Sequence, residues 1–218
     1  MDASAFVREL QAENDRLLER LRTDRPIPRG DERFSVRNLL RVALRNELEA
    51  TELAALWIPV TPEIDVKLGF AQQAGDEAKH YRLIEQRLRG LGDSLEGFDP
   101  LGGCASSLFR YLTTLPTTVE RLAAGQFTRE AIALVKNDQF IELCETQGDS
   151  ETARLYREVI QPDETFHHRL GGRLLEKHAT TPDLQDRARA AGCKTLELAE
   201  ELAGLALEKT GLHHTPGC

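Results

Sequence analysis

Apolar residues along this chain recur at the three- and four-residue spacing of helices, and alternating runs of β-branched residues are missing. This pattern predicts an all-α protein. Capping residues, prolines and glycines bound the apolar stripes and indicate where each helix begins and ends. The predicted helices cover residues 3–22, 35–58, 62–90, 106–114, 117–147, 150–178 and 182–210. We expect Pro59 and Pro62 to end the second helix, and Gly192 and Gly204 to interrupt the last one.

The four long central helices pair into two predicted hairpins, because a short turn joins the members of each pair. The segment between them, with Pro100 and two glycines, is long enough to return the chain to the same end of a bundle. We therefore predict a helical arm and linker at 1–30, a four-helix bundle at 31–180, and a C-terminal helix at 181–218 packed on it. The pattern leaves open whether the arm packs on its own bundle or on a second subunit.

Composition narrows the class of protein. The 218 residues carry a formal charge of −8, and no Lys/Arg cluster has the size of a phosphate-binding surface, so nucleic acid is a disfavoured partner. The longest strongly apolar run, residues 53–58, is too short to cross a membrane. The first residues lack the features of a signal peptide, and the four isolated cysteines suit a reducing compartment, so we expect a cytoplasmic protein.

One eight-residue phrase nearly recurs in the chain. Residues 76–83 and 163–170 both read D-E-x-x-H-[YH]-R-L. Positions i and i+3 share a helix face, so each copy directs a carboxylate and an imidazole the same way. If the two helices face each other, two Glu and two His meet at a common point, which is much of the shell for a pair of metal ions.

A dinuclear carboxylate site needs one further acidic ligand from each partner helix. Glu47 and Glu130 lie about as far from their turns as the motif glutamates do, and both sit on apolar stripes. A buried carboxylate is costly unless it is paired or bound to metal. Glu49 and Glu52 share a stripe with Arg45, which predicts a solvated face instead.

The phrase Asn46-Glu47-Leu48 followed by Asp76-Glu77-Ala78-Lys79-His80 resembles the first hairpin of bacterioferritins. Over residues 35–178 the chain resembles the ferritin-like diiron carboxylate superfamily, whose fold is a four-helix bundle of two antiparallel hairpins with a long crossover. The resemblance covers the acidic and histidine residues Glu47, Glu77, His80, Glu130, Glu164 and His167.

The resemblance also implies roles. Glu77 and Glu164 would bridge two metals. Glu47 and His80 would bind one metal, and Glu130 and His167 the other. Asp76 and Asp163 would hold the tautomers of the histidines.

Carboxylate and imidazole ligands without a thiolate suit iron or manganese. We therefore expect two Fe ions, or Mn, or a mixed Mn/Fe pair. We expect no haem and no flavin; the only methionine is Met1, so the haem-ligating Met of bacterioferritins is missing.

Several functions fit such a site. The first is an oxidase or oxygenase that uses O2 on a small organic substrate, with an external electron donor and a homodimeric chain. The second is a ferroxidase or iron-storage protein, and the third a rubrerythrin-like peroxide reductase or a manganese catalase. The chain lacks Cys-x-x-Cys, so rubredoxin-type iron is not expected. The fourth is a metal-free structural bundle.

Weaker signals concern a substrate channel and the other histidines. The residues that we expect to line a channel are Phe70, Ala74, Phe127, Leu134 and Gly171. Gly171 together with Pro162 fits either room for a substrate or close packing of helices, and the sequence does not choose. The four histidines outside the motif positions are expected at the surface: His168, His178, His213 and His214.

Overall fold

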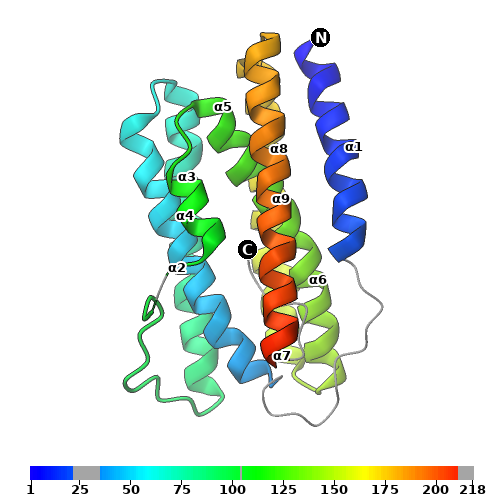
Figure 1. Cartoon of the computed structure of the whole chain (residues 1–218). Coiled ribbons are helices and arrows are strands. Elements are labelled where there is room, and N and C mark those ends of the chain that lie inside the picture. The colour runs from blue at the N-terminus through cyan, green and yellow to red at the C-terminus, as the bar shows by residue number, and fades with distance from the viewer. Residues whose placement is uncertain (22–34, 104, 211–218) are drawn as a thin grey trace.

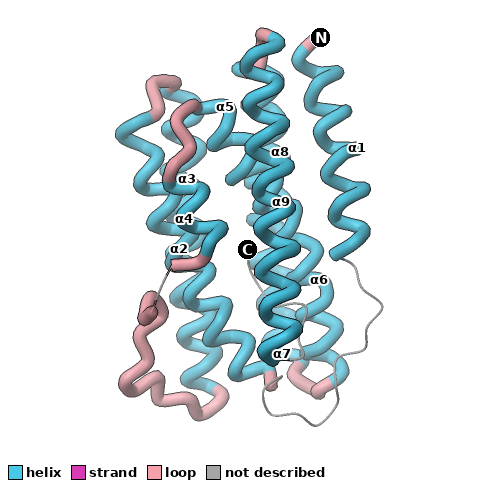
Figure 2. Tube along the Cα trace, viewed as in Figure 1, coloured by secondary structure: helices cyan, strands magenta, loops and turns pink. Residues whose placement is uncertain are grey.

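The computed structural model describes residues 1–21, 35–103 and 105–210, which form a helical bundle with no strand in these ranges (Figures 1 and 2). The all-α prediction is confirmed. The linker residues 25–30 and His213 and His214 lie outside the described residues. Within the described ranges, no helix has both the length and the apolar character that crossing a membrane requires.

The elements follow the predicted order with two π-helical segments inserted. They are α1 (Ala3–Leu21), α2 (Val36–Val60), α3 (Ile64–Gly90), α4 (Ser107–Thr113), α5 (Thr118–Arg121), η2 (Leu122–Arg129), α6 (Glu130–Thr146), α7 (Ser150–Leu155), η3 (Tyr156–Ile160), α8 (Gln161–His178) and α9 (Pro182–Thr210). The segments η2 and η3 are the π-helical ones.

Two hairpins form the centre of the bundle. The first is α2 and α3. In the second, α5, η2 and α6 form one rod and α7, η3 and α8 form the other. The chain leaves α3 at the lower end in Figure 1 and climbs through α4 to enter α5 at the upper end. As a result α3 and α6 run in the same direction.

Helix α2 is longer than predicted. Ser35 caps it by accepting a hydrogen bond from the backbone N–H of Asn38 at 3.3 Å. The helix continues through Pro59 to Val60, so the predicted end before Pro59 was wrong. Side chains serve the carbonyls that this end leaves free: Thr61 donates to the Trp57 carbonyl and Arg121 to the Val60 carbonyl.

The long helix predicted at 117–147 is not uniform, because residues 122–129 adopt π-helical geometry. Gly171 of α8 meets this segment backbone to backbone: a Cβ there would lie 2.8 Å from the Gln126 carbonyl carbon. Of the two roles left open for Gly171, its contacts show close packing of helices.

The second π-helical segment accommodates Pro162. In η3 the Gln161 N–H bonds to the Tyr156 carbonyl, five residues back. Such a turn skips one carbonyl in the hydrogen-bond ladder, and Pro162 removes one donor just beyond it. The sequence predicted a break in the ladder at Pro162, and the structure provides a widened turn directly before it.

Apolar residues pack into an upper and a lower cluster along the bundle, and a smaller third cluster joins α1, α6 and α9. The upper cluster contains Trp57, Phe70 and Leu122, and the lower one contains Leu40, Ile84 and Tyr156. Helices α1 and α9 pack against the second hairpin. Helix α9 continues through Gly192 and Gly204, so the predicted interruptions were wrong.

The close approach at Gly171 makes a stability prediction. Gly171→Ala should lower the free energy of unfolding by about 1 to 3 kcal/mol, because the new methyl group overlaps backbone atoms that cannot rotate away. Gly75→Ala is the control, since a Cβ there meets nothing within 4 Å, and it should raise the free energy of unfolding by about 1 kcal/mol. Urea denaturation measures both; equal effects of the two variants would contradict the packing described.

Candidate metal centre

Four helices direct acidic and histidine side chains to one point between the two apolar clusters. α2 contributes Glu47, α3 contributes Glu77 and His80, and α8 contributes Glu164 and His167. Glu130 stands where η2 passes into α6. None of these six residues is more than 3% exposed.

Their ligand atoms form two overlapping groups. Glu47, Glu77, His80 and Glu164 offer atoms that all lie within 4.8 Å of one another, and so do Glu77, Glu130, Glu164 and His167. Glu77 and Glu164 belong to both groups. The sequence motif therefore supplies the shared pair, and each group adds one His and one Glu of its own.

The two imidazoles face the carboxylates through the same ring nitrogen. His80 Nδ1 lies 3.3 Å from Glu77 Oε2, 3.5 Å from Glu47 Oε2 and 3.7 Å from Glu164 Oε1. His167 Nδ1 lies 3.2 Å from Glu164 Oε2 and 3.8 Å from Glu77 Oε1. Nδ1 is thus the atom that each histidine offers to the centre.

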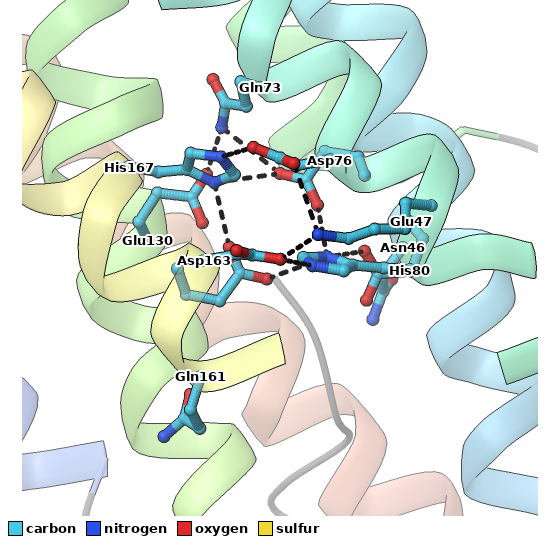
Figure 3. Close-up of polar contacts among 12 residues, drawn as sticks. Asn46, Glu47, Gln73, Asp76, His80, Glu130, Gln161, Asp163 and His167 are labelled. Atoms are coloured by element: carbon cyan, nitrogen blue, oxygen red, sulfur yellow. Dashed lines mark hydrogen bonds and ion pairs between the residues drawn. The ribbon is translucent and has the colours of Figure 1, made fainter. Parts of the chain in front are cut away.

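Each aspartate of the motif contacts Nε2 of the histidine in the other repeat. His80 Nε2 lies 2.9 Å from Asp163 Oδ2, and His167 Nε2 lies 3.1 Å from Asp76 Oδ2 (Figure 3). A carboxylate accepts a hydrogen bond from the Nε2–H and so favours the tautomer whose Nδ1 lone pair can bind a metal. Each repeat therefore orients the histidine of the other.

Lys79 joins the two aspartates. Its ammonium donates to Asp163 and, at 3.4 Å, to Asp76. The lysine side chain is 43% exposed, so this network connects the buried histidines to the surface. Phe166 occupies the equivalent place in the second repeat, and a single lysine therefore serves both halves.

Without metal, burial and mutual repulsion shift the pKa values of the carboxyls in this cluster. Burial raises the pKa of Glu47 to about 7, although contact with His80 opposes the rise. Burial and then repulsion between carboxylates raise the pKa of Glu130 and of Glu164 well above the usual range.

His80 and Glu77 behave as an ion pair. Burial disfavours the charged imidazole, but hydrogen bonds to Glu47 and Glu77 outweigh it and raise the pKa of His80 to about 12. Burial likewise opposes ionisation of Glu77, but the hydrogen bond with His80 lowers its pKa to about 2. A cation inside the cluster would replace these protons.

The donor set fits a pair of divalent metal ions. Four carboxylates carry four negative charges when ionised, which two divalent cations neutralise. Oxygen and imidazole donors without a thiolate suit iron or manganese. The buried thiol of Cys144 belongs to neither ligand group.

The expected channel residues do not gather at this centre as a group. Phe70 is buried in the upper apolar cluster, where its ring lies 5.2 Å from that of Trp57. Phe127 stacks on His168 at 4.7 Å. Ala74 and Leu134 are half-buried. A channel lined by these residues stays a prediction.

Two expectations of solvent exposure were wrong. His168 is largely buried and bridges Phe127 O and Gln11, because α1 covers it. Glu49 pairs with Arg45 as expected, yet it is only 7% exposed, because Ser106 of the crossing segment covers it. His178 is partly covered and pairs with Asp65.

The sequence patterns did not indicate Tyr156. Its side chain is fully buried, and its hydroxyl has no hydrogen-bond partner among the described residues. Burial and then the charge of Glu47 raise the pKa of Tyr156 well above its ordinary value. Tyr156 begins the π-helical segment η3 and lies eight residues before Glu164, a spacing that places both on one stripe of a regular helix, so this spacing could have indicated it.

Comparison of the chain with protein-family models, with curated proteins and with solved structures found no match. The class of the protein therefore rests on its fold and on the geometry of the site. The protein is an all-helical bundle with buried carboxylate and histidine groups that could hold metal ions.

The crosswise aspartates make a prediction about metal affinity. Asp163→Asn should weaken binding of Mn²⁺ or anaerobic Fe²⁺ by about 10- to 100-fold, because an amide holds the His80 N–H less strongly than a carboxylate. Asp65→Asn is the control, since Asp65 pairs with Lys177 and His178 instead. Metal titration of both variants is the measurement; equal affinities would contradict the role of Asp163.

The buried carboxylates make a prediction about the metal-free protein. With metal chelated, Glu130→Gln should keep or raise the free energy of unfolding, by on the order of 1 kcal/mol, because it replaces a fully buried carboxyl whose ionisation burial and the neighbouring carboxylates oppose. The amide still accepts the hydrogen bond from Gln73. Added metal should then stabilise the wild type more than the variant. A marked loss of stability in chelator would show that Glu130 serves the fold itself.

Proposed function

We propose that this chain is a ferritin-like dinuclear metal carboxylate protein that uses O2 to oxidise a small organic substrate. The observation that carries the proposal is the sharing of Glu77 and Glu164 between two buried ligand groups, each completed by one His and one Glu. An ion pair between one His and one Glu would not require two ligand groups of the same composition. Two metals bridged by the shared carboxylates would use all six residues.

The course of the chain supports the ferritin-like class. Two antiparallel hairpins are joined by a segment that crosses the length of the bundle (Figure 1). Each hairpin contributes residues from both of its rods to the ligand cluster. Glutamates from two helices with Glu-x-x-His pairs from the other two are the ligand pattern of dimetal bundles of this class.

The roles of the residues follow from their positions. Glu47 with His80, and Glu130 with His167, would each hold one ion, while Glu77 and Glu164 would touch both. When bound, a pair of ferrous ions supplies electrons to O2. The protein excludes water from the ligands by burying them between two apolar clusters. Asp76 and Asp163 accept hydrogen bonds from the Nε2 atoms, so that each Nδ1 would face the metal that displaces its proton.

The terminal helices favour an enzyme over an iron store. α1 and α9 pack along the second hairpin and occupy surface that a cage of compact bundles would use for assembly. We therefore expect a small oligomer such as a homodimer, with an external electron donor for repeated turnover.

Oxygen consumption tests the proposed function. The wild-type chain, loaded anaerobically with Fe²⁺, should take up O2 rapidly on mixing, and His80→Ala and His167→Ala should slow the uptake by about 100-fold or more. His178→Ala is the matched control, because this residue pairs with Asp65 away from the cluster.

Two outcomes would contradict the proposal. Equal rates in all variants would mean that the cluster does not bind the reacting iron. Oxidation by hydrogen peroxide but not by O2 would identify a peroxide reductase instead.

A further inference from the structure

The side chain of Gln126 is fully buried, yet neither its Nε2 nor its Oε1 has a hydrogen-bond partner among the described residues. A buried amide without partners costs free energy, and folded proteins rarely keep one. Gln126 lies four residues before Glu130, on the π-helical segment that leads into the ligand cluster. π-Helical segments are frequent at functional sites.

Two glycines fix where this amide lies. Gly171 lets α8 approach the backbone of Gln126 and Phe127, as described above. On the opposite side, the Nε2 of Gln126 lies only 3.6 Å from the point at which Gly69 of α3 would carry a Cβ. The amide therefore points from η2 toward Gly69 of α3, and side-chain carbons of Leu170 and Leu174 of α8 lie 3.2 and 3.5 Å from the same point.

Gln73, one turn beyond Gly69 on α3, is a second buried amide with an atom unpaired within the described part of the chain. Its Nε2 donates to Glu130 and, at 3.4 Å, to Glu77. With metal bound, both carboxylates would be ionised and could only accept, which would hold the amide in this orientation. Its Oε1 is buried and has no partner among the described residues. Figure 3 shows this oxygen directed away from the carboxylates. Gln73 thus joins the ligand cluster to the layer that contains Gln126.

We propose that Gln126 and Gln73 bind the polar group of the organic substrate, one helical turn from the metal ligands. This inference rests on the proposed function and names the substrate class for the same site. The two amides present one N–H donor group, on Gln126, and two acceptor oxygens, one on each residue.

The pattern of free atoms selects the chemistry of the ligand. A hydrocarbon would leave every one of these atoms unpaired, and a carboxylate has no donor for the two oxygens. A neutral group that carries both an N–H or O–H donor and an acceptor satisfies them. We therefore assign the site to an uncharged small molecule with a primary amide or a similar hydroxyl-bearing group.

Stability gives the first test. Leu is close to Gln in size and needs no hydrogen bond, so Gln126→Leu should raise the thermal unfolding midpoint of the ligand-free protein. A site kept for binding is expected to cost stability in this way. Gln72→Leu, at the exposed residue next to Gln73, is the control and should leave the midpoint nearly unchanged. A clear fall in the midpoint of Gln126→Leu would overturn the inference, because the amide would then be stabilising the fold.

Binding gives the second test. Trp57 is the only tryptophan of the chain, and its ring lies against Gly125, next to Gln126. Its fluorescence should change saturably with acetamide, at about millimolar concentration for so small a probe. Acetate has the same shape without a donor and should give no saturable change. The titration is run in chelator, so that neither probe binds metal.

The variants complete the binding test. Gln126→Leu should weaken acetamide binding by at least about tenfold, while Gln72→Leu should bind it as the wild type does. No saturable change in the wild type, equal effects of acetate and acetamide, or unchanged binding by Gln126→Leu would each overturn the inference. These outcomes leave O2 uptake by the iron-loaded protein untouched, so a failure here is distinguishable from a failure of the proposed function.

Discussion

Mutual repulsion among four buried carboxylates is the constraint on which the rest of the structure depends. Glu47, Glu77, Glu130 and Glu164 meet between two apolar clusters where water cannot screen them. Protons relieve part of this repulsion, as the raised pKa values of Glu47, Glu130 and Glu164 show. Two divalent cations would relieve all of it. The crossed aspartates orient both imidazoles in this setting, because they hold each Nε2 and leave each Nδ1 facing the cluster.

The duplicated motif is more than two equivalent halves. Each Asp serves the histidine of the other copy, so neither copy can form its half of the site without its partner helix. Lys79 of the first copy donates to both aspartates, whereas the equivalent residue of the second copy is Phe166. The asymmetry extends to the backbone: π-helical segments occur in the second hairpin and not in the described residues of the first. They set the side chains of Gln126 and Tyr156 beside a cluster that is otherwise nearly symmetric.

Much of the fold can be predicted from local sequence patterns. Apolar spacing and caps such as Ser35 place the helices, and the distance from each turn selects Glu47 and Glu130 as the residues level with the motif. What the sequence could not provide arises from contacts between helices. The π-helical turns depend on how η2 packs against Gly171, and the burial of His168 depends on α1. The continuation of α2 through Pro59 depends on Arg121, which comes from a distant part of the chain.

Metal content tests the central claim most directly. Protein reconstituted anaerobically with Fe²⁺ or Mn²⁺ and freed of excess metal should contain about two ions per chain. His80→Ala and His167→Ala should each lose metal, because each removes one of the two Nδ1 ligands that face the cluster. Less than about half an ion per wild-type chain would contradict the claim. The six buried side chains would then form a hydrogen-bonded cluster that holds protons alone.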